Sequence, residues 1–227
     1  MKNRRLRSSL MMVALAAFLA APAARASMVT YYLNQSNVET VYPDGTDYAK
    51  VVIEDVGSDI RFTVSVLPGI FAADSNFGIQ SFGFNVISGG PTLTSSNFLL
   101  PSSDWGVGNG SGCGGNQDGF GDFACVVSGK GNVRADPLVF SITGVSGDLL
   151  STYFDLSSNN SGQGNQYFAL HIAGFTPPVG TNVDSGFFAG GYQHRDVVPL
   201  PAAAWLLLSG VAGLGAMARR RKVAAEA

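Results

Sequence analysis

Two cysteines, Cys113 and Cys125, have the clearest chemistry in the sequence. They are the only cysteines among 227 residues and lie 12 positions apart in a glycine-rich segment. Cysteines outside the cytoplasm pair by default, and neither of these has the Cys-x-x-Cys neighbour typical of a zinc site. We therefore expect a disulfide, whose closed loop would stabilise the fold by about 2–3 kcal/mol.

Residues 116–122, inside that loop, partly match a calcium-binding sequence. Oxygen atoms at alternating positions, here on Asn116, Asp118 and Asp122, can converge on a hard cation, and a glycine permits the sharp turn. The match is incomplete, because the first ligand position is a glycine and the twelfth is a cysteine where a glutamate is needed. A plain glycine-aspartate turn is the stronger interpretation, and we predict no cofactor.

No set of residues indicates catalysis. His171 is a candidate general base, but a lone histidine on a strand is more often a surface or core residue. The sequence has no Gly-x-Ser-x-Gly elbow for a serine hydrolase, and no pair of carboxylates stands out for glycoside hydrolysis. We therefore expect the protein not to be an enzyme.

The composition is poor in charge, with 13% charged residues, 46% hydrophobic residues and 29 glycines. The formal net charge of −2 hides an asymmetry, because nine of the 14 basic residues lie close to the two ends of the chain. Residues 27–198 hold five Lys or Arg and 15 Asp or Glu, a net charge of about −10. This acidic balance excludes a domain that binds nucleic acid through a basic surface.

The middle of the chain alternates apolar and polar residues with period two, as strands with one buried face do. Short turn sequences separate these runs, and no window has a convincing amphipathic helix. The pattern predicts an all-β domain at residues 27–196, an antiparallel β-sandwich or jelly roll. We expect strands at residues 28–33, 48–55, 60–66, 81–86, 105–107, 123–127, 138–143, 168–173 and 187–192.

The first 26 residues are typical of a secretory signal peptide. Four basic residues lie within the first seven positions, and an apolar run at residues 10–21 follows. That run is too short to span a bilayer comfortably, which argues against the alternative of an uncleaved anchor. Ala24 and Ala26 provide the small-x-small cleavage pattern, so that Ser27 would begin the mature chain.

The other end of the chain predicts one membrane-spanning helix. The apolar run at residues 202–218 is just long enough to cross a hydrocarbon core of about 30 Å, and four basic residues follow it directly. The positive-inside rule keeps this cluster, and the tail at residues 223–227, in the cytoplasm. The predicted topology places residues 27–196 outside the inner membrane.

This tail closely resembles the PEP-CTERM sorting signal, which has a Pro-x-Pro motif, a transmembrane helix and a basic end. The motif here is the Val-Pro-Leu-Pro variant, and the signal would cover residues 197–222. The resemblance implies export by a Gram-negative bacterium and recognition by an exosortase, a membrane transpeptidase that would cut near the motif. The residues that carry it are Val198, Pro199, Leu200, Pro201, Arg219, Arg220 and Arg221.

These patterns lead to two hypotheses about function. The first is an exported protein of the cell envelope or extracellular matrix, which the exosortase sorts from the inner membrane and which associates with exopolysaccharide and biofilm. The second is a lectin-like module that binds extracellular polysaccharide, in a calcium-dependent form if the loop at residues 116–122 holds the ion. Aromatic residues such as Trp105 and Tyr31 are candidates to stack on sugar rings.

Overall fold

The structure is a computed structural model that describes residues 27–108, 112–159 and 162–193. The described residues form strands and two short 3-10 turns, with no α-helix among them. The elements are β1 (Met28–Ser36), β2 (Ala49–Val56), β3 (Asp59–Val66), β4 (Ala73–Phe84), η1 (Ser95–Asn97), β5 (Phe98–Leu99), β6 (Trp105–Val107), β7 (Gly115–Gln117), β8 (Gly121–Phe123), β9 (Cys125–Gly129), β10 (Leu138–Ile142), η2 (Leu150–Tyr153), β11 (Phe168–Phe175) and β12 (Ser185–Tyr192).

Ten of these strands form one antiparallel sheet in the order β5-β10-β3-β2-β1-β12-β11-β4-β9-β6. The remaining pair, β7 and β8, forms a separate hairpin. The predicted all-β, antiparallel class is therefore confirmed. Most of the predicted strands are present, and the Trp105–Val107 strand has the predicted bounds.

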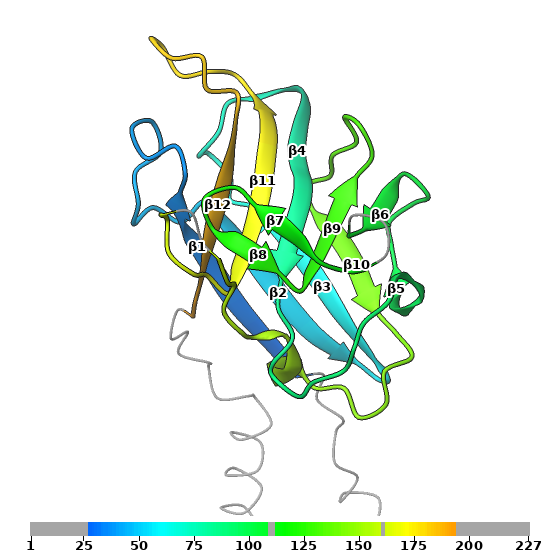
Figure 1. Cartoon of the computed structure of the whole chain (residues 1–227). Helices are drawn as coiled ribbons and strands as arrows, with labels where there is room; N and C mark the ends of the chain where they lie inside the picture. The colour runs from blue at the N-terminus through cyan, green and yellow to red at the C-terminus, as the bar shows by residue number, and fades with distance from the viewer. Residues whose placement is uncertain (1–26, 109–111, 160–161, 194–227) are drawn as a thin grey trace, which may run out of the picture. The chain divides into compact units, whose positions relative to one another are not determined.

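The sheet folds back on itself and packs its two halves face to face around one core, as the layers of a sandwich do. The strands β2, β3 and β10 lie behind β4, β9 and β11 (Figure 1). Phe62 on β3 stacks on Phe140 of the neighbouring β10, with ring centroids 4.9 Å apart. It also meets Phe84, on the distant strand β4, at 5.1 Å. Aromatic packing therefore joins strands that share no hydrogen bonds.

The period-two alternation accounts for this core. Ile60, Phe62 and Val64 on β3 are buried, whereas the residues between them are more exposed. The strand β2 follows the same pattern, with Val51 and Ile53 buried. Each strand therefore contributes alternate side chains to the core and turns the others outward.

The β7–β8 hairpin covers part of the outer face of the sheet and makes a second, smaller core. It lies in front of β11 and β12 (Figure 1), and its Phe120 and Phe123 are buried with Val126, Ala169 and Ala189. The strand predicted at residues 123–127 is present from Cys125 onward as β9, but its predicted start is wrong, because Ala124 separates β8 from β9. The N–H of Ala124 donates to the Asn85 side chain at 2.7 Å, away from the strand ladder.

The hairpin fits because the side chains beneath it are small. Ala169 on β11 pairs with Gly83 on β4 and with Ala189 on β12. We call Gly83, Ala169 and Ala189 the small-residue row. A Cβ atom on Gly83 would lie only 2.9 Å from the Phe123 ring and 3.0 Å from Gln117. A larger side chain in this row would therefore push the hairpin outward.

We expect Gly83→Ala to lower the free energy of unfolding by about 1–3 kcal/mol, because the new methyl group overpacks the contact with Phe123. Gly106→Ala on β6 is the matched control, since no atom lies within 4 Å of its added Cβ. The control should stay within about 0.5 kcal/mol of the parent protein. Urea denaturation of the three proteins measures both changes, and equal stabilities for the two variants would show that the hairpin does not press on Gly83.

Candidate functional site

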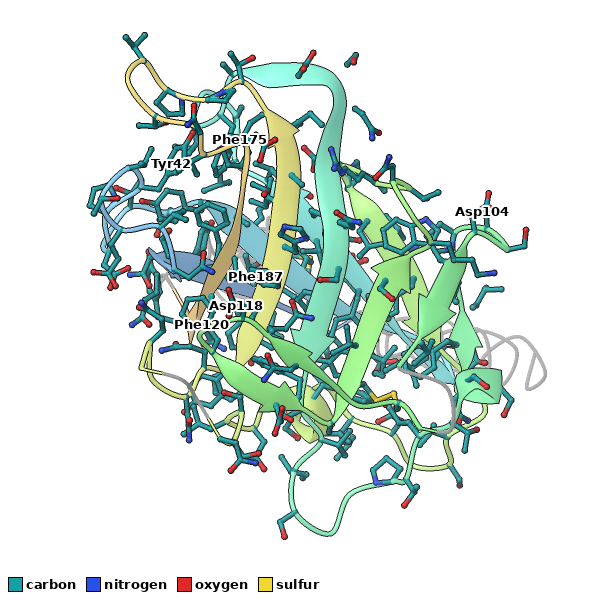
Figure 2. The ribbon with its side chains drawn as sticks, turned by 45° about the horizontal axis from the view of Figure 1, so that its top comes forward. Tyr42, Asp104, Asp118, Phe120, Phe175 and Phe187 are labelled. Carbon is teal, nitrogen blue, oxygen red and sulfur yellow. A yellow bond between two sulfur atoms is a disulfide. The ribbon has the colours of Figure 1, made fainter. Side chains whose placement is uncertain are left out.

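The predicted disulfide is present between Cys113 and Cys125, with Cα atoms 4.4 Å apart. Cys113 lies two residues before β7 and Cys125 begins β9, so the bond closes the base of the β7–β8 hairpin. Both cysteines are buried. The covalent link therefore holds the hairpin beside the sheet that it covers (Figure 2).

Asp122 on β8 accepts hydrogen bonds from two asparagine side chains. Asn116, its partner across the hairpin, donates to one carboxylate oxygen, and Asn159 donates to the other, each at 3.0 Å. These bonds, with that from Asn116 the larger, hold the pKa of Asp122 below its usual range. The backbones of Asp122 and Ser158 also exchange two hydrogen bonds, which fasten the hairpin to the loop before β11.

The three calcium candidates are not all together. Asn116 and Asp122 are neighbours, but Asp118 lies in the hairpin turn, where it accepts a hydrogen bond from Asn37 at 3.2 Å. Within the described residues, no three His, Cys, Asp or Glu residues gather as metal ligands. Calcium binding therefore stays a prediction, and side-chain amide groups already bond these carboxylates.

A hollow of about 210 Å³ lies on the outer face of the sheet, beyond the part that the hairpin covers. We call it the outer hollow. His171 and Ala173 project from β11 into it, and a bulge in the pairing of β4 with β11 lies between them. Its lining consists of Gln80, Arg134, His171, Ala173, Gly174, Asp184 and Ser185.

His171 is held against the aromatic ring of Phe187. The two residues pair across β11 and β12, and their rings stack with centroids 4.5 Å apart. Burial, and secondarily the nearby charge of Arg134, lower the pKa of His171 in the folded protein, while Asp118 and Asp184 act in the opposite direction. The sequence correctly placed this histidine on the face opposite Leu170.

Arg134 and Asp184 reach the outer hollow from two loops that are far apart in the sequence. Arg134 follows a loop that returns to β4 through the backbone pair of Ile79 and Ala135. Asp184 directly precedes β12. Sequence reasoning missed both residues, because the strand pattern does not show which loops meet over β11.

The outer hollow offers hydrogen-bond donors and acceptors but no nucleophile of evident reactivity. Both cysteines are consumed by the disulfide. The predicted sugar-stacking residues Trp105 and Tyr31 are buried, with exposed fractions of 5% and 4%, so they serve the core. The arrangement can bind a small polar group.

A larger hollow, of about 440 Å³, lies beside the disulfide at the far side of β9. Its wall includes both cysteines, but the other lining residues are small, hydroxyl-bearing or apolar. Its lining contains no ionisable side chain, because the two cysteines are joined in the disulfide. It therefore offers a ligand no charged group, unlike the outer hollow.

The predicted sorting residues 198–201 and 219–221, and the cleavage positions Ala24 and Ala26, lie outside the described residues; Ser27 is the first described residue. In the described part of the chain, no helix has the length and apolar character to cross a membrane. The chain matches no protein-family model, no curated protein and no solved structure.

We expect the double variant Cys113→Ser, Cys125→Ser to lose about 3 kcal/mol of unfolding free energy, because its unfolded chain is no longer restricted by the closed loop. Guanidinium denaturation with and without reductant measures this. Reductant should destabilise the parent protein by a similar amount and leave the double variant unchanged. A parent protein indifferent to reductant would show that the bond does not hold the hairpin.

We also expect stability to depend on pH through His171. Because its pKa is lowered in the folded state, the unfolded chain binds a proton first as the pH falls below about 6.5. The free energy of unfolding should therefore be fully present above that pH and decrease as the pH falls toward the folded pKa. His171→Gln should flatten this decrease, whereas His194→Gln, at the only other histidine, measures any remaining contribution. If His171→Gln left the decrease in stability unchanged, the pH dependence would not come from His171.

Proposed function

We propose that the protein is exported and sorted to the cell surface or extracellular matrix by an exosortase, where it associates with exopolysaccharide. The signal peptide at residues 1–26 and the sorting signal with its transmembrane helix at residues 197–222 are part of this proposal. The observation that carries it is the tail, in which Val-Pro-Leu-Pro, an apolar run and Arg-Arg-Arg-Lys follow one another without interruption.

Two features of the described domain support an existence outside the cytoplasm. A structural disulfide, Cys113–Cys125, persists in an oxidising compartment and is rare in reducing ones. The domain is acidic and glycine-rich, with many exposed carboxylates in its turns, which suits a hydrated polysaccharide matrix. Neither feature depends on the tail.

The proposal assigns the domain a structural or binding role without catalysis. A second candidate role, binding of carbohydrate, is favoured by the outer hollow, where one histidine, one arginine and one aspartate converge on a small volume. This role is compatible with the first, because a matrix protein needs some attachment to its surroundings.

The sorting proposal predicts the mass and location of the mature protein. Protein recovered from its native cells and medium should begin at Ser27, end near Pro199 and lie outside the inner membrane. Its mass should rise by about 2 Da on reduction, one hydrogen for each sulfur of the disulfide. Intact-mass spectrometry of the membrane, surface and medium fractions measures all three features.

The double variant Pro199→Ala, Pro201→Ala tests the motif, and Pro177→Ala, in an exposed loop of the domain, is the matched control. The double variant should keep residues 202–227 and stay in the inner membrane, whereas the control should be processed like the parent protein. Unprocessed parent protein, found in the inner membrane alone, would show that the tail is a plain anchor.

A further inference from the structure

The lining of the outer hollow includes one positive and one negative side chain that do not form an ion pair with each other. Arg134 and Asp184 both line it. The one ion pair among the described residues joins Arg61 to Glu54, on other strands, so Arg134 and Asp184 form none between them. In a domain with few cations, an arginine without a carboxylate partner is available to a ligand.

Three of the lining groups already make a hydrogen bond within the protein. Arg134 donates from Nη1 to the Asn76 carbonyl at 2.6 Å, and Gln80 donates from Nε2 to the Gly131 carbonyl at 2.7 Å. Ser185 donates to one oxygen of Asp184 at 3.2 Å.

Gln80, Arg134 and Asp184 each keep hydrogen-bonding atoms that these bonds do not use. The bond from Gln80 uses its amide nitrogen and leaves the amide oxygen as an acceptor. Asp184 keeps its second carboxylate oxygen as another acceptor. Arg134 uses Nη1 for the bond to Asn76 and keeps further guanidinium donors, although its Nε is buried and has no hydrogen-bond partner in the described structure.

The geometry of the backbone also favours this arrangement. Gly174, at the end of the hollow, has a φ of 76°, in the left-handed region. A Cβ at this position would collide with the Asn76 carbonyl and with Nη1 of Arg134. The close approach of Arg134 to β11 therefore requires a glycine there.

Charge and size together favour a small ligand without a net charge. A cationic ligand would meet Arg134, and an anionic one would meet Asp184, whereas neutral hydroxyl groups can accept from the first and donate to the second. The volume of about 210 Å³ is below the roughly 300–1,000 Å³ of pockets for drug-sized ligands. One small, uncharged, hydroxyl-rich ring fits both limits.

We propose that the outer hollow binds one uncharged sugar residue through Arg134, Gln80 and Asp184, next to the stacked rings of His171 and Phe187. An extracellular polysaccharide as the source of that sugar rests on the proposed function. The binding of the sugar ring itself rests on the second candidate role, carbohydrate binding, and does not depend on the sorting proposal.

Calorimetric titration of the full-length chain, in a zwitterionic detergent without a sugar headgroup, tests this. The probes are D-glucose, D-galactose, D-mannose and N-acetyl-D-glucosamine, with D-glucuronate and D-glucosamine as charged counterparts. At least one neutral sugar should bind, and its tightest example should bind at least about tenfold more tightly than either charged sugar. Exopolysaccharide from the native cells, in a separate arm, tests the source.

Asp184→Asn should weaken the binding of that sugar by about tenfold or more, since hydrogen bonds to a charged group are the strong ones. Asp59→Asn is the matched control, because Ser58 donates to Asp59 at 3.2 Å just as Ser185 does to Asp184, and Asp59 begins β3, on another strand than the outer hollow. The control should bind like the parent protein, and both variants should keep its melting temperature.

Three results would overturn the proposal: no binding of any neutral sugar, tighter binding of D-glucuronate, or equal affinity of the Asp184→Asn variant. Binding of the monosaccharide without the exopolysaccharide would keep the sugar site and reject its source. A correctly sorted protein that binds no sugar would reject the sugar site and leave the proposed function standing.

Discussion

The outer layer of this domain depends on three side chains being small. Gly83, Ala169 and Ala189 lie side by side across β4, β11 and β12, and they leave room for Phe120 and Phe123 to be buried on a sheet face that would otherwise meet water. The β7–β8 hairpin packs on this face, and the Cys113–Cys125 bond closes its base. The hydrogen bonds between Asp122 and Ser158 fasten the hairpin to the neighbouring loop.

This layer divides the domain into an inner core and an outer face that carries polar groups. The inner core consists of apolar and aromatic residues such as Phe62, Phe84 and Phe140. The outer face is free to carry polar groups beyond the hairpin, where His171 and Asp184 lie.

The sequence predicted the elements whose pattern is local. Alternation in β3 and β11 identified the strands and placed His171 on the outer face. The disulfide was predicted because the chain has only two cysteines, and cysteines outside the cytoplasm pair by default. The hairpin was missed because β7 and β8 are short and consist mostly of Gly, Asn, Gln and Asp, the residue types of a turn. Arg134 and Asp184 were missed because their meeting depends on which loops the folded sheet brings over β11, and that information is not local.

The central claim is that the hairpin is docked as a second layer on the small-residue row. Amide hydrogen exchange of the oxidised protein tests it most directly, read at Asp122 and Ser158, which bond each other across the hairpin and the loop. The account predicts that both amides exchange far more slowly than those of an exposed turn such as Gly57. Exchange as fast as in that turn would show that the hairpin is not held against the sheet.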